Sequence, residues 1–379
     1  MKEYRIGIVG AGMMGKTHAW CWRSMPFFYE GLDFRVRLHG VCTSRLETAR
    51  AARDAYGFER AYASVGELIE SDEVDVVDIA SPNHCHLEAV LAASRLGKPV
   101  YCDKPLTGNL AEALAIEREV ANPSRAGQMV FHNRFLPATM RARAMVESGD
   151  LGEIIAFRAA YLHSGNVPPG KRLAWKDLRS HGAGVLYDLG SHLADLVTWV
   201  CGDAIAEVHA RQKTLHARRP SYEDPNVLVE QDTDDMTLMS VVTRNGALGV
   251  LEASKIATGA QDDLRFEIHG TNGAIRFSLM DPNYLDWFDQ RDPEAPLGGE
   301  SGFKRLHCVR RYPAPAGFPS PKAAIGWLRG HLHCAYSFVS ALHEGREFDP
   351  SIGRGIEIER VLAAVQRSAD AGTSVRLDG

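Results

Sequence analysis

The chain has 379 residues, more than one hydrophobic core usually holds, so we expect two domains. A hydrophobic content of 45% and a charged content of 24% are typical of a water-soluble globular enzyme, and a net charge of -5 gives no electrostatic footprint for nucleic acid or an anionic membrane. No apolar run resembles a membrane span or a signal peptide, and the seven scattered cysteines argue against a disulfide framework, so we expect a cytoplasmic location.

The first third of the chain alternates between strand and helix patterns. It begins with an apolar strand over residues 5–9, which breaks into the glycine-rich turn 10–15 and a helix over 16–22. The expected elements that follow are strands at 36–42, 74–80, 99–102 and 128–131 and helices at 46–56, 65–70, 87–96 and 110–121. Apolar strands that alternate with helices predict an α/β fold, with a parallel, doubly wound sheet in a first domain over residues 1–131.

The pattern changes after residue 131. We expect helices at 140–148, 184–200, 325–344 and 353–371, and strands at 154–161, 206–213, 236–243, 249–254, 264–269 and 274–278. Hairpin turns at Asn245-Gly246 and Thr271-Asn272-Gly273 predict a large, mostly antiparallel open sheet in a second, α+β domain over residues 132–379. Residues 281–322 are rich in Pro, Gly and charge and are expected to form a long loop, and the last helix is a candidate to pack back on the first domain.

The turn Gly10-Ala11-Gly12-Met13-Met14-Gly15 has the spacing G-x-G-x-x-G between a strand and a helix. Gly10 makes a turn that a side chain would block, Gly12 lets the backbone approach a pyrophosphate, and Gly15 lets the helix lie close to the strand. The helix N-terminus then faces the phosphate charge. The turn predicts a dinucleotide site of the Rossmann type, against the alternative of a purely structural glycine turn; its contacts are Gly10, Gly12, Met13 and Met14.

The end of the second strand is the usual position of an acid that binds the adenosine ribose. Here Thr43, Ser44 and Arg45 follow the strand, and no carboxylate occurs before Glu47. Two hydroxyls and a guanidinium suit a 2′-phosphate better than a bare diol, so the sequence favours NADP over NAD. The alternative is that Thr43 or Ser44 caps the next helix.

Two further turns follow parallel strands, at the edge where such sheets bind ligands. The first is Ser81-Pro82-Asn83-His84-Cys85-His86, whose histidine spacing is poor for a tetrahedral metal site, so we expect no metal there. We likewise expect His331, His333 and Cys334, on one helix, to pack or to face solvent. The second turn contains Lys104.

Lys104 is held out of the α region by Pro105, so its side chain projects from the strand end. Beside a cationic nicotinamide ring the pKa of this lysine would fall, and it could exchange a proton with a substrate hydroxyl. The alternative is a surface lysine paired with Asp103.

Asp188 and His192 are four residues apart on an expected helix and so share a face. A carboxylate and an imidazole flanked by apolar residues suit general acid–base work on a hydroxyl. The alternative is a buried Asp–His hydrogen bond that only holds the helix.

These motifs, in this order and spacing, resemble the glucose–fructose oxidoreductase/inositol dehydrogenase/MocA (Gfo/Idh/MocA) family over nearly the whole chain. The resemblance includes Ser81-Pro82-Asn83 with His86, Gly97-Lys98-Pro99-Val100 before the lysine, Asn133-Arg134-Phe135 after the last parallel strand, and Asn245-Gly246-Ala247-Leu248-Gly249. It implies NAD(P)-dependent oxidation of a sugar or cyclitol hydroxyl to a ketone, or the reverse. The cofactor contacts that it adds to the glycine turn and to Thr43–Arg45 are Ser81, Pro82, Asn83, His86, Asp103, Lys104, Asn133 and Arg134.

By the same resemblance, Lys104, Asp188 and His192 form the catalytic set. His192 is the expected proton acceptor, Lys104 binds and polarises the reacting oxygen, and Asp188 orients the substrate; the lysine as base is an open alternative. Asp103 departs from the family, which usually has Glu at this position. Its carboxylate is shorter, which bears on the ring contact expected there and not on Lys104. Candidate substrate contacts beside the catalytic set are Arg134, Tyr161, His163, Trp175, Lys176 and His181. The family's sheet commonly packs face to face, which implies a homodimer or homotetramer.

Two other functions compete with a sugar or cyclitol dehydrogenase. One is a redox-assisted glycosidase or lyase, which oxidises and re-reduces its substrate with a tightly held cofactor. The other is a catalytically silent nucleotide sensor, which retention of Lys104, Asp188 and His192 disfavours. Net production of reduced cofactor separates the first two.

Overall fold

The computed structural model describes residues 1–309, 312–320 and 322–377, and the chain forms two compact units. The first unit comprises Met1–Phe135, the segment that begins at Tyr312, and Gly326–Glu359. The second unit comprises Leu136–Arg311, Lys322–Ile325 and Arg360–Gly379. The first unit therefore takes in two later segments beyond the expected 1–131.

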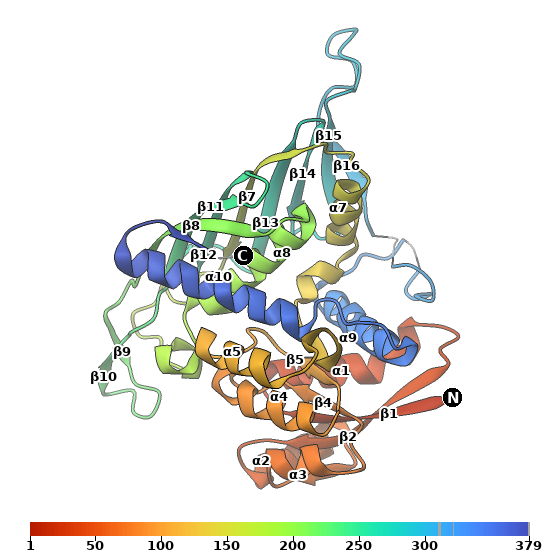
Figure 1. Cartoon of the computed structure of the whole chain (residues 1–379), viewed down its shortest axis with the longest axis vertical. Helices are drawn as coiled ribbons and strands as arrows, with labels where there is room; N and C mark the ends of the chain where they lie inside the picture. The colour runs from red at the N-terminus through yellow and green to blue at the C-terminus, as the bar shows by residue number, and fades with distance from the viewer. Residues whose placement is uncertain (310–311, 321, 378–379) are drawn as a thin grey trace. The chain divides into compact units, whose positions relative to one another are not determined.

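The first unit contains a fully parallel sheet with the strand order β3-β2-β1-β4-β5-β6 (Figure 1). Its elements are β1 (Lys2–Val9), α1 (Met13–Phe28), β2 (Phe34–Cys42), α2 (Leu46–Tyr56), β3 (Arg60–Tyr62), α3 (Val65–Glu70), β4 (Val76–Ile79), α4 (His86–Arg95), β5 (Val100–Cys102), α5 (Leu110–Glu119), α6 (Pro123–Ala126) and β6 (Gly127–Met129). Strands β4 and β5 are wholly buried, as helices on both faces of a parallel sheet require. The doubly wound sheet is confirmed, while β3 and α6 were missed because such short elements carry no periodic pattern.

A late helix of the chain belongs to the core of the first unit. Helix α9 (Trp327–Glu344) packs against α1, where Trp22, Tyr101 and Phe338 form an aromatic cluster with ring centroids 5.1–6.2 Å apart. His331, His333 and Cys334 are buried on α9, so the expected choice between packing and solvent resolves to packing.

The second unit contains a nine-stranded sheet with the order β16-β15-β14-β13-β7-β12-β11-β8-β17. All neighbouring strands are antiparallel except β7 and β12, which confirms the mostly antiparallel sheet. Helices α7 and α8 pack on one face of the sheet (Figure 1). The elements are α7 (Pro137–Glu147), β7 (Ile154–Leu162), α8 (Ser191–Cys201), β8 (Ile205–Lys213), β9 (Arg218–Pro220), β10 (Leu228–Glu230), β11 (Met236–Thr243), β12 (Leu248–Ser254), β13 (Asp263–Gly270), β14 (Gly273–Ser278), β15 (Tyr284–Asp289), β16 (Lys304–His307) and β17 (Val375–Arg376).

Two expectations for the second domain need correction. The 281–322 segment is not a loop throughout, because β15 and β16 pair as a hairpin that extends the sheet and projects beyond it in Figure 1. Short paired strands with charged faces resemble a polar loop in sequence. The helix expected over 184–200 begins instead with a π-helical turn, η5 (Leu186–Gly190), and only then continues as α8.

The cause of the π-helical turn lies in Asp234. The carboxylate of Asp234 accepts a hydrogen bond from the Leu186 backbone N–H at 3.0 Å and holds the start of the turn. Gly184 has φ +103°, and a Cβ there would lie 2.1 Å from the Asp234 carboxylate, so only glycine allows this approach. Single π turns of this kind often mark functional sites.

The last helix, α10 (Ile352–Ala371), contains the boundary between the units, which falls after Glu359. Within the first unit, the carboxylate of Glu359 accepts a hydrogen bond from the Thr107 backbone N–H at 3.1 Å. The start of the last helix is thus anchored to the loop that follows Lys104.

Candidate functional site

Three turns lie side by side at the carboxyl edge of the first unit's sheet. The glycine turn follows β1, the Ser81 turn follows β4, and Lys104 follows β5; these three strands are adjacent and parallel. Ligands bind at this edge in open α/β sheets. The sequence prediction that these motifs share one edge is therefore borne out by the strand order.

The glycine turn has the shape that a pyrophosphate needs. Gly10 has φ +100°, and a Cβ on it would lie 2.5 Å from the Ala80 carbonyl oxygen; a Cβ on Gly15 would lie 2.0 Å from the Gly10 carbonyl oxygen. At Gly12, by contrast, a Cβ would meet no atom within 4 Å. Gly12 also begins α1 without a side-chain cap, and the first turn of α1 has no acidic residue. The close contacts explain two glycines structurally, and the open space at the third fits an anionic group at the helix N-terminus.

The Ser81 turn and the Lys104 turn are joined by His86. Its ring is fully buried, with Nε2 2.9 Å from the Ser81 carbonyl oxygen and Nδ1 3.0 Å from the Pro105 carbonyl oxygen. His86, one of the candidate cofactor contacts, therefore links the backbones of the two turns through its ring nitrogens. Asn83 is buried in the turn, and Cys85 is exposed.

Lys104 is half-buried, and its backbone N–H donates a hydrogen bond to the Asp103 carboxylate at 2.9 Å. The carboxylate thus closes the turn through the main chain. Asp103 is itself buried.

A buried carboxylate that the sequence reasoning missed lies in the strand before the Ser81 turn. Asp78 is fully buried in β4 and accepts hydrogen bonds from His18 Nδ1 at 2.8 Å and Trp22 Nε1 at 2.7 Å. Burial alone would lower the pKa of His18, but Asp78, with a smaller contribution from Asp103, raises it. The signal was present, because Asp78 interrupts a strand that we expected to be continuously apolar.

The pKa of a second buried histidine, His331, moves in the opposite direction. Burial, together with His132, His18 and Lys104, lowers the pKa of His331 well below its usual range. Its ring stacks on His132 with centroids 3.7 Å apart. The side of the first unit near Lys104 therefore contains two buried imidazoles whose pKa values move in opposite directions.

The turn after β2 does not contain the helix cap that was considered for Thr43 or Ser44. The N-cap of α2 is Arg45, with no side-chain capping bond, and the Thr43 hydroxyl donates to the Arg45 carbonyl oxygen at 2.8 Å. Neither Thr43 nor Ser44 caps the helix, so that alternative is wrong. Ser44 and Arg45 are exposed.

Two other candidates, Asn133 and Arg134, are buried on the 3-10 turn η2 (His132–Phe135). The guanidinium of Arg134 donates to Asp349 at 2.9 Å.

In the second unit, Asp188 lies on the π-helical turn and is ion-paired with Lys255. The two atoms, Lys255 Nζ and Asp188 Oδ2, are 2.7 Å apart, and the Asp188 side chain keeps 29% of its surface exposed. Lys255 follows β12 and is buried. Burial alone would lower its pKa, but Asp188, Asp177 and Asp234 together raise it, so the lysine is charged.

His192 is buried in the first turn of α8, with its ring edge-on to Tyr161 at a centroid distance of 5.8 Å. The Tyr161 hydroxyl donates to Asp262 Oδ1 at 2.7 Å, and His163 Nε2 lies 3.0 Å from the same oxygen. Burial raises the pKa of Asp262, but the bonds from His163 and Tyr161 outweigh it and lower the pKa overall. The structure thus brings His192, Tyr161 and His163 into one cluster around Asp262, which sequence reasoning missed.

The remaining candidates lie on two 3-10 turns, η3 (Trp175–Asp177) and η4 (Arg179–His181). Trp175 and Lys176 are exposed, and His181 is half-buried.

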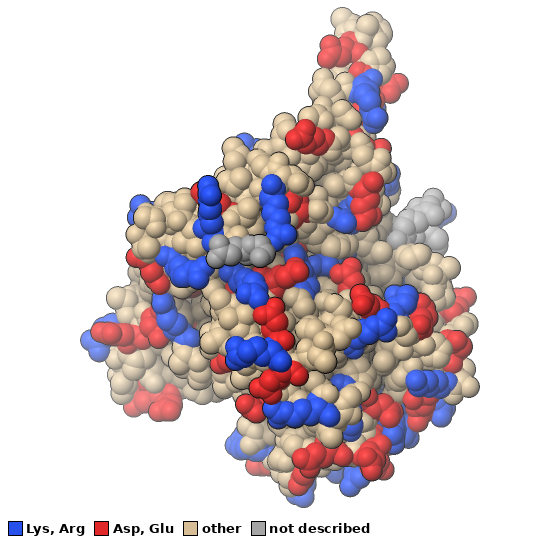
Figure 2. All heavy atoms as spheres, viewed as in Figure 1, with Lys and Arg blue, Asp and Glu red and all other residues tan. Residues whose placement is uncertain are grey.

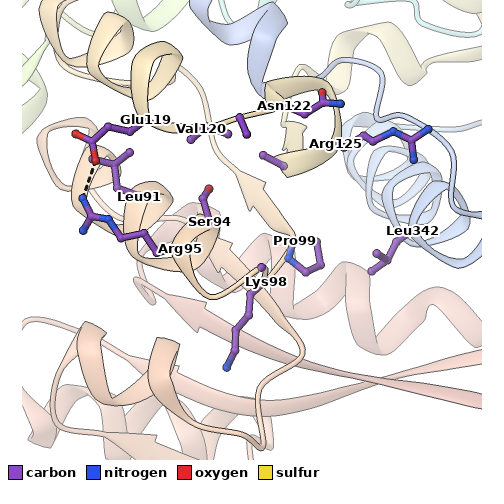
Figure 3. A pocket seen from close by; sticks show the side chains of 13 residues that line it. Leu91, Ser94, Arg95, Lys98, Pro99, Glu119, Val120, Asn122, Arg125 and Leu342 are labelled. Carbon is purple, nitrogen blue, oxygen red and sulfur yellow. Dashed lines mark hydrogen bonds and ion pairs between the residues drawn. The ribbon is translucent and has the colours of Figure 1, made fainter.

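A hollow of about 390 Å³ lies at the opposite, amino edge of the first unit's sheet (Figure 3). Its charged side chains have partners within the protein: Arg95 is paired with Glu119 at 2.7 Å, and Lys98 donates to the Ser71 carbonyl oxygen at 2.7 Å. In Figure 3 the Lys98 ammonium is turned away from the hollow. The residues that line the hollow do not include the glycine turn or the start of α1.

Acidic and basic side chains of the described residues are interspersed on the face drawn in Figure 2. Within the described ranges, no three His, Cys, Asp or Glu side chains are grouped to hold a metal ion. Nor does any helix in the described part of the chain have the length and apolar character needed to cross a bilayer.

Comparison with known proteins agrees with this geometry. The sequence model for the NAD-binding Rossmann fold of the GFO/IDH/MocA oxidoreductase family matches residues 4–131, and the model for a C-terminal domain of that family matches residues 139–276. The chain is 30% identical to levoglucosan dehydrogenase of Pseudarthrobacter phenanthrenivorans, over 97% of each chain, and 28% identical to myo-inositol 2-dehydrogenase of Thermotoga maritima, over 72% of this chain and 74% of that one.

The fold also matches a solved structure of levoglucosan dehydrogenase in complex with NADH and levoglucosan. The TM-score is 0.94, at 28% identity, with 100% of both chains covered.

Proposed function

The chain belongs to the GFO/IDH/MocA oxidoreductase family and has its NAD-binding domain, and from that premise we propose that it moves a hydride between a nicotinamide cofactor and a secondary hydroxyl or ketone of a sugar or cyclitol. The bound nicotinamide supplies the hydride acceptor or donor. The relatives named for levoglucosan and inositol are consistent with a ring-shaped polyol as substrate.

The observation that carries the proposal is the pairing of charges in the second unit. Lys255 balances the charge of Asp188 at 2.7 Å, and Asp262 lies within hydrogen-bond distance of Tyr161 and His163, so the cluster offers both hydrogen-bond donors and acceptors. Such a site suits a neutral molecule with many hydroxyls, since those can both donate and accept. A sugar phosphate or sugar acid would need an unpaired cation there.

We assign three roles on this basis. Lys104 binds and polarises the reacting oxygen, His192 accepts its proton during oxidation, and Asp188 accepts a hydrogen bond from a substrate hydroxyl. His192 and Asp188 lie on consecutive turns, η5 and α8, which fixes them in one rigid stretch of backbone.

For the cofactor, we propose that NADP is accepted at least as well as NAD. Thr43, Ser44 and Arg45 lack a carboxylate, and Ser44 and Arg45 are exposed where a 2′-phosphate would lie. The related levoglucosan dehydrogenase structure in complex with NADH is consistent with NAD as the alternative cofactor. Arg45→Asp should lower the ratio of NADP to NAD affinity by about tenfold, because it replaces a phosphate partner with a like charge. An unchanged ratio would refute the 2′-phosphate argument.

We also propose a cytoplasmic homo-oligomer that associates through the open face of the nine-stranded sheet. Leu238, Leu248 and Val250 are exposed on paired strands β11 and β12, on the same face. All seven cysteines are free, which suits a reducing compartment. Val250→Glu should halve the mass measured by sedimentation, and a monomeric wild-type chain would refute this assembly.

A substrate panel tests the proposed function. Sugars, inositols and levoglucosan are assayed with NAD and NADP, with reduced nicotinamide followed by absorbance. We expect stoichiometric cofactor reduction with at least one polyol. Turnover of a glycoside without net reduction would indicate the redox-assisted glycosidase or lyase instead. Cofactor binding without turnover of any panel member would favour the sensor.

A further inference from the structure

The ion pair between Lys255 and Asp188 joins a residue that sequence reasoning missed to one of the three proposed catalytic residues. Lys255 is fixed from both sides of its backbone: its N–H donates to the Asp235 carbonyl oxygen at 2.8 Å, and its carbonyl oxygen accepts from the Asn166 N–H at 2.9 Å. Its ammonium, 6% exposed, reaches the partly exposed Asp188 carboxylate. A buried, main-chain-anchored cation is therefore aimed at a carboxylate that solvent can reach.

The Lys255–Asp188 pair is surrounded by other titratable groups. Strands β7, β11 and β12 and helix α8 all contact the π-helical turn that carries Asp188. Besides Lys255 after β12, these elements bring Tyr161 from β7, Asp234 before β11 and His192 from α8, and Asp177 lies within electrostatic range of Lys255 from η3. Lys171 is a further cation nearby, and it is bonded to Asn166 and paired with Asp177 at 3.5 Å. Lys255 thus interacts with three carboxyl groups, of which Asp188 is bonded to its ammonium at 2.7 Å.

We propose that Lys255 is the positioning residue of the second unit: it fixes Oδ2 of Asp188 and keeps this carboxylate ionised, so that Asp188 accepts a hydrogen bond from a hydroxyl of the substrate. The inference rests on the proposed function. A buried ammonium beside a carboxylate favours the charged form, and only the charged form is purely an acceptor. A polyol hydroxyl, which donates, then binds in one orientation.

Removal of the ammonium should affect turnover through Asp188. Without the Lys255 ammonium, Asp188 loses the adjacent positive charge that favours its ionised form, and a protonated Asp188 would compete as a donor. The effect should grow as the pH falls, because the protonated fraction grows. Substrate binding should weaken, while cofactor binding, which the first unit provides, should not change.

The test compares Lys255→Met, which keeps the length of the side chain without charge, with Lys255→Arg, which restores the charge. For Lys255→Met we expect kcat/KM for the polyol to fall about 100-fold and the acid limb of its pH profile to move up by about one unit. Lys255→Arg should return kcat/KM to within about tenfold of wild type and restore the limb. The matched control is Lys304→Met, which removes an exposed lysine paired with Asp292 at 2.7 Å on the β15–β16 hairpin and should change neither.

Unfolding temperature and cofactor affinity are measured on every variant. Wild-type kcat/KM and pH profile in folded Lys255→Met would overturn the inference and leave the proposed function standing. Equal loss in the Met and Arg variants with an unshifted pH limb would reduce Lys255 to a structural role and overturn it as well. A wild-type enzyme inactive on the whole panel would refute the proposed function itself, and with it this role of Lys255.

Discussion

The two units hold their candidate functional residues in place by different means. In the first unit most of the contacts that shape the turns involve the main chain. They comprise a glycine turn, a histidine bonded to carbonyl oxygens and a carboxylate bonded to a backbone N–H, all at the ends of adjacent strands. In the second unit the site consists of side chains that hold one another, such as Tyr161 with Asp262 and Lys255 with Asp188. The first design tolerates little change in shape, and the second tolerates little change in charge.

Individual carboxyl groups in the two units are stabilised in different ways. Asp188 and Asp235 of the second unit face the cations Lys255 and Arg219 at 2.7 and 3.7 Å. Glu359 of the first unit faces a backbone N–H, and its burial raises its pKa to about 8. Asp188 and Asp235 are therefore balanced by a nearby cation, whereas Glu359 has a backbone donor and its burial favours the protonated form.

The largest effect is expected from Lys104→Ala. If the first unit supplies a reactive ammonium at the end of β5, turnover should fall by about 10³-fold or more, because a polarising and proton-exchanging group is lost. Cofactor affinity should stay within a few-fold of wild type. Steady-state kinetics and fluorescence titration with NAD(P)H measure the two quantities separately.

The matched control is Lys98→Ala, at the other end of the same short strand. Lys98 donates to the Ser71 carbonyl oxygen, next to the hollow of Figure 3, and its loss should leave turnover unchanged. Near-normal turnover in Lys104→Ala would remove this lysine from the mechanism.

The second-largest effects are expected in the glycine turn, where one variant should lower cofactor affinity and another should lower stability. Gly12→Ala adds a Cβ where no atom lies within 4 Å, so the fold should keep its stability while NAD(P) affinity falls about 100-fold, since the methyl group occupies the pyrophosphate's approach. Gly15→Ala places a Cβ 2.0 Å from the Gly10 carbonyl oxygen and should instead destabilise the unit by about 3 kcal/mol. Thermal unfolding with and without NADP distinguishes them; equal affinity in Gly12→Ala would exclude this turn as the phosphate site.

The different construction of the two units explains which parts of the structure could be predicted from the sequence. The parallel sheet, its order of motifs and the glycine turn were predicted because each depends on residues within a short window. Asp188 and His192 were singled out by their four-residue spacing on an expected helix, and the resemblance supplied their roles. Asp262 and Lys255 were missed because their partners lie far away in sequence: Tyr161 and Asp262 are 101 residues apart.

Other misses have local physical causes. The π-helical turn depends on Asp234, which approaches Gly184 from outside the helix. Asp78 was overlooked because a single acid in an apolar strand does not change its period, although His18 and Trp22 make it the centre of a buried network.

The third prediction tests the contrast in buried carboxyl groups. Glu359 has a raised pKa of about 8 in the folded chain, against an ordinary value near 4.5, so between these pH values the unfolded chain loses a proton that the folded chain keeps. Stability should therefore fall by about 1.4 kcal/mol per pH unit as the pH rises from 5 to 8. Glu359→Gln mimics the protonated form and should remove this slope, measured by urea unfolding.

Glu357→Gln is the control for this slope, because Glu357 is exposed on the same helix and paired with Arg354. An identical slope in wild type and Glu359→Gln would mean that Glu359 is solvated, and the difference between Glu359 and the cation-paired carboxylates would lose its support.

The smallest effect is expected from Tyr161→Phe, which removes one hydroxyl and keeps the ring against His192. If the second unit acts through mutually held side chains, Asp262 loses one of two donors, and the substrate KM should rise about fivefold with kcat within about twofold. Tyr284→Phe on the β15 strand should leave both constants unchanged, because its ring contacts with His307 and Arg305 do not need the hydroxyl. A fall in kcat at constant KM would mean that Tyr161 acts on the transition state, so the cluster around Asp262 would take part in chemistry as well as in binding.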